Sequence, residues 1–123
     1  MNAVLNGKGL LDPGTGLPGR ELLIDRLTHA LARARTHGTL VTLTIVAGPP
    51  VLATRLRKAL REDQTVAHLT DTLIAVITEH PYGTGKPIAD RIRRLARTDA
   101  GWFTSAGKEK VHEVILTAET HLG

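Results

Sequence analysis

The chain has 123 residues, of which 41% are hydrophobic and only 2% aromatic, so a single domain with an aliphatic core is expected. It contains no cysteine, which excludes disulfides, thiolate zinc sites and cysteine nucleophiles and fits a cytoplasmic location. The net charge of +4 would suit an anionic partner such as a nucleic acid, although arginine-rich solvated helix faces are the simpler explanation.

Residues 1–9 show no clear period and are interpreted as a flexible lead-in to one domain over residues 10–123. The start of the chain lacks a basic stretch followed by a long apolar run, so no signal peptide is predicted. No apolar stretch approaches the roughly 18 residues that cross a bilayer, and no contact with a membrane is expected.

The first half of the domain predicts a loop, a helix, a strand and a second helix. Residues 12–19 are dense in glycine and proline, which indicates an irregular loop. Apolar residues then recur at three- and four-residue steps over 18–36, which predicts a helix that Gly38 ends. The β-branched run over 40–46 predicts a strand, and a helix over 50–61 begins with proline. The side chains expected to be buried in the two helices are Leu23, Leu27, Ala30, Leu31 and Ala34, then Leu52, Leu56, Ala59 and Leu60.

The second half predicts three more strands and two more helices. Strands over 65–69 and 73–78 are joined by a turn short enough for a hairpin. A helix over 87–97, a strand over 102–105 and a helix over 108–121 follow. The helix residues expected to be buried are Ile88, Ile92 and Leu95, then Val111, Val114, Ile115 and Ala118.

After the first helix, the elements follow the order β-α-β-β-α-β-α. This order predicts an α/β (α+β sandwich) fold with a ferredoxin-like β-α-β-β-α-β antiparallel sheet and an additional helix at each end of the chain. Right-handed crossovers place the first and third strands at the centre of the sheet. Two helices then cover one face, and the additional helices must cover the other face or dock at an edge.

Two segments carry a resemblance to a known family. Residues 12–20, DPGTGLPGR, look like the D-x-L-T-G-L-x-N-R signature that opens GGDEF domains, the diguanylate cyclases and their relatives, with Gly14 and Gly19 as departures. Residues 61–77 resemble the family's R-x-x-D segment, signature hairpin and following apolar strand. The resemblance covers about residues 10–123 in shortened form and implies a bacterial signalling protein. The signature pentapeptide itself is replaced by Thr70, Asp71, Thr72, Leu73 and Ile74.

The resemblance implies where a cyclase of this family would hold magnesium, on carboxylates at the end of the first strand and in the hairpin. Here the strand ends in Ala47 followed by Gly48, Pro49 and Pro50, and the hairpin acid position is Thr72. The family's guanine-reading segment after the first strand is missing. We therefore expect no cyclase activity, no catalytic residues, no bound metal and no cofactor.

The family's product-binding R-x-x-D pattern is also altered. Arg61 is retained, but Gln64 stands at the acid position and Asp63 lies one residue early. The weak candidates for ligand binding are Arg61, Asp71, Arg91 and Arg94. The arginines of the second and third helices could also contact phosphates of a nucleic acid, although no exposed aromatic platform accompanies them.

Other patterns are weaker. The six histidines are expected at the surface or at sheet edges, and His68 could interact with Asp71 across the hairpin. The run Gly83-Thr84-Gly85-Lys86 lacks the full G-x-x-x-x-G-K-[ST] pattern of a phosphate loop and predicts a flexible loop.

The sequence thus predicts a non-catalytic GGDEF-like domain that serves as a regulatory or protein-interaction module, through a homodimer or another protein partner. The alternatives are a module that binds a nucleotide or cyclic dinucleotide, and a basic accessory protein for nucleic acid.

Overall fold

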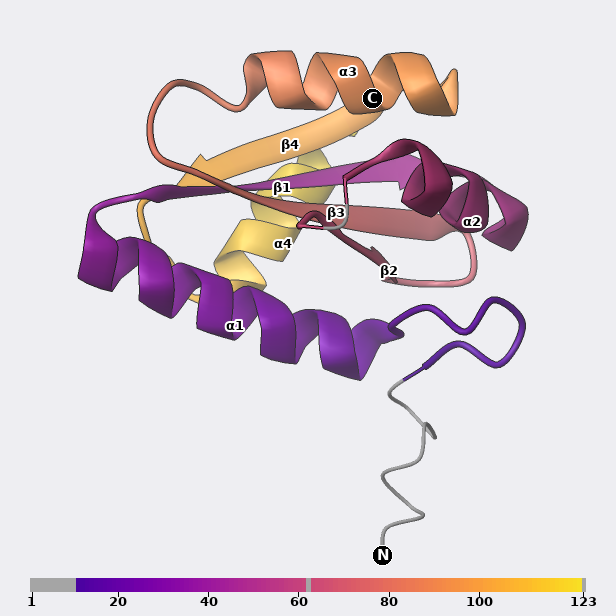
Figure 1. Cartoon of the computed structure of the whole chain (residues 1–123), viewed down its shortest axis with the longest axis horizontal. Coiled ribbons are helices and arrows are strands. Elements are labelled where there is room, and N and C mark those ends of the chain that lie inside the picture. Colours follow the sequence, from indigo (N-terminus) through magenta and orange to yellow (C-terminus); the bar gives the residue numbers. More distant parts are fainter. Residues whose placement is uncertain (1–10, 62, 123) are drawn as a thin grey trace, which may run out of the picture.

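The computed structural model describes residues 11–61 and 63–122, so the predicted lead-in over 1–9 lies outside the described residues. The elements are α1 (Arg20–His37), β1 (Leu40–Ala47), α2 (Pro50–Ala59), β2 (Thr65–His68), β3 (Leu73–His80), α3 (Lys86–Ala96), β4 (Ala100–Ser105) and α4 (Val111–Thr120). The strands form one antiparallel sheet in the order β2-β3-β1-β4 (Figure 1). The first and third strands are central, so the predicted ferredoxin-like sheet is confirmed.

The helices form a layer on each side of this sheet, and α2 and α4 lie on opposite sides of the strands in Figure 1. The odd-numbered core residues of β1, such as Leu43 and Ile45, pack with α1 and α4. The even-numbered Val46 packs instead with α2 and α3. The alternation of side chains along a strand explains both layers. The additional terminal helices therefore cover the second face, which is one of the two arrangements that the topology allowed.

The buried faces of three helices differ from the prediction, in α4 only because the predicted Val111 is half-buried at the start of the helix. In α2, Ala53 is buried and Ala59 is exposed, because the helix ends there and Leu60 closes the core. In α3, the buried side chains are Ala89, Ile92 and Ala96, while the predicted Ile88 and Leu95 are half-buried at the margin. Small residues on the buried face allow a helix to approach a sheet closely, and apolar pattern alone favours the larger neighbours.

The start of β4 and the start of α4 also differ from the prediction, one because of strand pairing and the other because of a local cap. Strand β4 begins at Ala100, two residues earlier than predicted, because Ala100 pairs with Val46 of β1. Helix α4 begins at Val111, where the Glu113 carboxylate accepts the backbone N–H of Lys110 at 3.0 Å and caps the first turn. No helix in the described part of the chain combines the length and apolarity needed to cross a bilayer.

Candidate functional site

The hairpin between β2 and β3 lies directly beside the end of β1. The Gly48 N–H donates to the Thr72 carbonyl oxygen at 2.9 Å, and Ala47 pairs with Leu73 in the sheet. The turn is closed by the Thr70 hydroxyl, which accepts the Leu73 N–H at 3.0 Å. The structure therefore brings together the two places where the resemblance puts metal ligands.

The donor atoms at this place do not fit a divalent cation. Mg²⁺ is bound in proteins through carboxylates and requires near-octahedral oxygen ligands. The end of β1 offers a methyl group and proline rings, Thr72 offers a neutral hydroxyl, and Ile74 is buried in the core. Asp71 supplies a single exposed carboxylate. Within residues 11–61 and 63–122, no three His, Asp or Glu side chains are grouped to hold a metal ion.

The glycine-rich loop before α1 is folded by Asp12. One carboxylate oxygen of Asp12 accepts both the N–H and the hydroxyl of Thr15 at 2.9 Å. Gly16 donates its N–H to the Asp12 carbonyl at 2.7 Å and has φ 72°, a conformation that glycine adopts without strain. The D-x-x-T-G spacing of the loop is thus explained by one turn.

This loop is tied to the signature hairpin by His68. Nε2 of His68 lies 3.0 Å from the Thr15 hydroxyl and 3.8 Å from the Asp12 carboxylate, and the His68 N–H donates to Pro18 at 2.8 Å. His68 lies on the edge strand β2, as the prediction of surface or edge positions allowed, but its side chain is buried, with 6% exposed. It contacts the loop, and not Asp71 as considered, because its side chain points from the edge of β2 toward Thr15.

The environment of Asp12 lowers the pKa of its carboxyl below the ordinary value, chiefly because the Thr15 hydroxyl donates to the charged form. Replacing Asp12 with asparagine is expected to cost about 1 kcal/mol of unfolding free energy at neutral pH. A lowered folded-state pKa gives stability that is present above the unfolded pKa and is lost as the pH falls through the folded value. Urea unfolding of both proteins from neutral to acidic pH should therefore show the difference shrinking.

Asp71→Asn is the matched control, since Asp71 is exposed at the hairpin turn. Its substitution should change stability by less than about 0.5 kcal/mol. A cost of Asp12→Asn that stays constant into acid would contradict a role for the carboxylate charge.

The basic ligand-binding candidates do not converge. Arg61 is 80% exposed beyond the end of α2, where its Nε lies 3.9 Å from Asp63. Arg91 and Arg94 are exposed on α3. Among the described residues, no hydrogen bond or ion pair joins any two of Arg61, Asp71, Arg91 and Arg94. Arg61 and Asp71 were chosen by family position and Arg91 and Arg94 by the clustering of arginines on the third helix, and the structure shows no contact that joins the two pairs.

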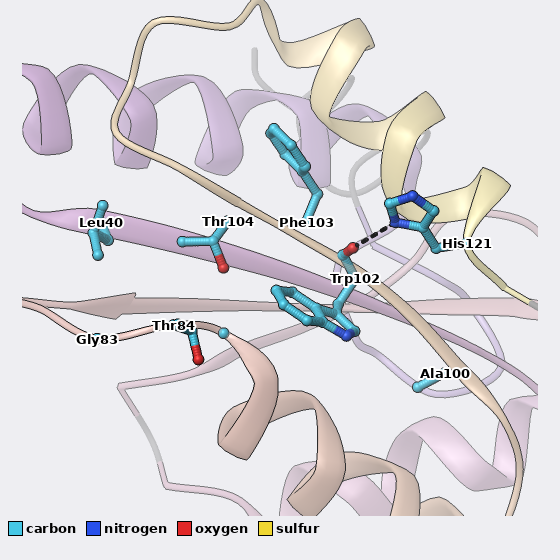
Figure 2. A pocket seen from close by; sticks show the side chains of 9 residues that line it. Leu40, Gly83, Thr84, Ala100, Trp102, Phe103, Thr104 and His121 are labelled. Atoms are coloured by element: carbon cyan, nitrogen blue, oxygen red, sulfur yellow. Dashed lines mark hydrogen bonds between the residues drawn. The ribbon is translucent and has the colours of Figure 1, made fainter.

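A cavity of about 580 Å³ lies instead at the outer side of β4 (Figure 2). Its lining is mainly apolar and includes Trp102, Phe103, Thr104, His121 and the loop at Thr84. Sequence reasoning treated Trp102 only as part of a strand and the loop only as flexible. The available signal was the one tryptophan of the chain on a strand with no charged residue.

The loop beside this cavity is held to the sheet by hydroxyl groups. The Thr42 hydroxyl lies 2.7 Å from both Thr104 Oγ1 and His80 Nε2. His80 Nδ1 lies 3.1 Å from the carbonyl oxygen of Tyr82. A Cβ on Gly85 would collide with Thr42 and Thr104, so the loop approaches the strands closely because this residue is glycine.

No family model matches the chain, and no curated protein does. Solved structures match it over most of its length. The FimX GGDEF domain of Pseudomonas aeruginosa is 18% identical with a TM-score of 0.78, covering 94% of this chain and 92% of that one. The fold is that of a GGDEF domain.

Two further GGDEF structures agree. The GGDEF domain of DgcB from Caulobacter crescentus, solved in complex with c-di-GMP, is 15% identical with a TM-score of 0.81 and covers 94% of this chain and 86% of its own. The diguanylate cyclase SiaD from Pseudomonas aeruginosa, solved with its activator SiaC, is 19% identical with a TM-score of 0.77. That match covers 98% of this chain and 59% of SiaD. The GGDEF fold implied by residues 12–20 and 61–77 is thus confirmed.

Proposed function

We propose that this chain is a non-catalytic GGDEF-like domain that acts through protein contacts, by self-association or by pairing with another protein. One observation carries the proposal. The end of β1 and the hairpin are joined at Gly48 and Thr72, as the scaffold of a cyclase requires, and the joined residues bear no metal-binding carboxylate. Without such ligands, this place cannot hold the metal ions whose charge offsets that of a triphosphate during phosphoryl transfer.

Two observations favour protein contacts as the remaining role. SiaD, part of which matches this fold, is solved as a complex with an activator protein. In this chain, the apolar cavity beside β4 lies away from the hairpin and is lined by Trp102 and Phe103. Aromatic side chains on accessible surfaces are enriched at protein interfaces.

A turnover assay tests the proposal. The purified chain incubated with GTP and Mg²⁺ is expected to form no cyclic dinucleotide detectable by mass spectrometry, while an active diguanylate cyclase assayed in parallel does. The reason is the donor set beside Ala47 and Thr72. Turnover of GTP above the background without protein would refute the proposal.

A variant with Ala47→Asp and Thr72→Glu tests whether the missing donor atoms are the reason that this place does not fit a metal ion. It places two carboxylates on the joined backbone segments, since Ala47 pairs with Leu73 next to Thr72. Calorimetry should show Mg²⁺ binding to the variant more tightly than to the parent chain. Equal binding would show that the donor atoms are not what separates this site from a metal site.

The alternative, a module that binds a nucleotide or cyclic dinucleotide, has one observation in its favour. DgcB is solved with c-di-GMP bound, so a domain of this fold holds such a ligand. In this chain, the retained Arg61 is exposed with Asp63 as its neighbour, and Gln64 turns inward to donate to the Thr78 hydroxyl at 2.8 Å. This arrangement favours the protein-contact proposal over the ligand-binding one.

A further inference from the structure

The outer edge of β4 exposes backbone hydrogen-bonding groups. Backbone groups of successive strand residues point alternately to the two sides of a strand. At the opposite edge of the sheet, the His68 N–H points outward, since it donates to Pro18. His68 is paired with Ile74, Ile74 with Val46, and Val46 with Ala100, so the backbone direction of each residue follows from that of its partner. The N–H and C=O of Ala100 therefore face outward, away from β1.

Trp102 and Thr104 follow the same alternation and face outward with Ala100. The direction is supported by a contact from outside the sheet, because His121 Nδ1 lies 3.1 Å from the Trp102 carbonyl oxygen. In the described part of the chain, no other hydrogen bond is made to the outward backbone groups of these three residues. The edge therefore offers a row of donors and acceptors.

The two edges of the sheet are treated differently. The outer edge of β2 is covered by the loop before α1, where Leu11 and Pro18 form a bridge and Pro18 accepts from His68. Strand β4, AGWFTS, carries no charge and no proline, which are the residues that ordinarily protect an edge from pairing. An unprotected edge of this kind is complementary to another extended strand.

The cavity of about 580 Å³ runs along this same edge. Figure 2 shows the indole of Trp102 on the α3 side of β4 and the ring of Phe103 on the other side, toward α4. Trp102 is only half-buried. An incoming strand would thus find both backbone partners and apolar surface for its side chains.

We propose that β4 pairs antiparallel with β4 of a second copy of this chain, with the two-fold axis at Trp102, to form a continuous eight-stranded sheet from two four-stranded ones. The proposal rests on the proposed protein-contact function and names its surface. In this register, Trp102 forms a hydrogen-bonded pair with Trp102 of the second copy. Ala100 of each copy then lies opposite Thr104 of the other. No charged side chain from 100–105 is buried by this register.

Charge and the position of His121 agree with this occupant. In this register the exposed Asp99 lies opposite Ser105 of the second copy, and residues 100–105 carry no charge, so the paired strands bring no like charges opposite each other. The Trp102 carbonyl has two lone pairs, so it can accept an incoming N–H as well as His121. His121 is exposed and can also turn away without uncovering the core.

Sedimentation velocity of the unmodified chain across micromolar concentrations tests the pairing. We expect a monomer–dimer equilibrium. Trp102 is the only tryptophan, so its emission reports this edge alone. The emission should move to shorter wavelength along the same concentration curve as the dimer forms, because the indole leaves water. A chain that stays monomeric throughout overturns the proposal.

Two edge variants locate the interface. Thr104→Pro removes an outward N–H without touching the ladder to β1, and by symmetry the dimer loses two hydrogen bonds. Its dissociation constant should rise about tenfold or more. Thr104→Lys places a charge in the edge cavity and should also weaken the dimer. It replaces Thr104→Pro as the test if the proline variant does not fold.

Matched controls separate the edge from general effects. Thr42→Val removes the same Thr42–Thr104 hydrogen bond from inside the sheet, and Leu116→Lys adds the same charge on the outer side of α4, where Leu116 is 65% exposed. Both should dimerise like the parent. A dimer that all four variants leave unchanged would overturn β4 as the interface while leaving self-association intact. Turnover of GTP would instead remove the proposed function, whatever the oligomeric state.

Discussion

Leu27→Ala is expected to reduce the free energy of unfolding by about 2–5 kcal/mol, the cost of a cavity at a fully buried leucine. Leu27 is 0% exposed in α1 and packs in the cluster with β1, β3 and α4. A loss of this size would take a large share of the stability of a domain this small. Urea or thermal unfolding followed by circular dichroism measures it.

Leu116→Ala provides the comparison, because it makes the same chemical change on the exposed side of α4. Its cost should stay within about 0.5 kcal/mol. Equal costs for the two variants would show that α1 is not part of the core of the domain, contrary to the structure.

Gly101→Ala is expected to destabilise the domain by about 1–3 kcal/mol through overpacking. A Cβ at Gly101 would collide with backbone atoms of Ala118, His121 and Leu122, which belong to the end of α4 and the residues after it. Backbone cannot rotate away as a side chain can, so α4 must shift. The shift should also move His121 and change the emission of Trp102, which fluorescence measures beside unfolding.

Gly48→Ala is the control for an added methyl group. Its Cβ would meet the Leu52 side chain, which can change rotamer. It should therefore cost less than Gly101→Ala. The opposite order, with Gly48→Ala the more damaging, would contradict the close packing of α4 on β4.

The order of elements and the pairing of strands could be predicted because both follow from local patterns. Alternation over 40–46 and helical spacing over 18–36 are properties of neighbouring residues. With the β-α-β-β-α-β order known, right-handed crossovers leave one simple sheet. The loop of residues 12–20 was recognisable for the same reason, since Asp12 and Thr15 bond within one turn.

The burial of His68 could not be predicted. Its partners, Thr15 and Asp12, are more than fifty residues away in the sequence, and Thr15 approaches only because the loop covers the edge of β2. The same limit applied to Arg61 and Asp71, which belong to neighbouring family motifs but form no ion pair with each other, since Arg61 lies nearest Asp63. Side-chain partners of this kind depend on the distance between segments in space.

The sequence alone was sufficient for the scaffold and for the absence of a carboxylate at positions 47 and 72, because the identity of a residue is a local fact. Only the tertiary structure showed which edge of the sheet lacks a neighbour. Only the tertiary structure showed that Trp102 lies beside a cavity at that edge. The physical reason is that a free edge is a property of all four strands and the loop that covers β2, and no segment of β4 encodes it.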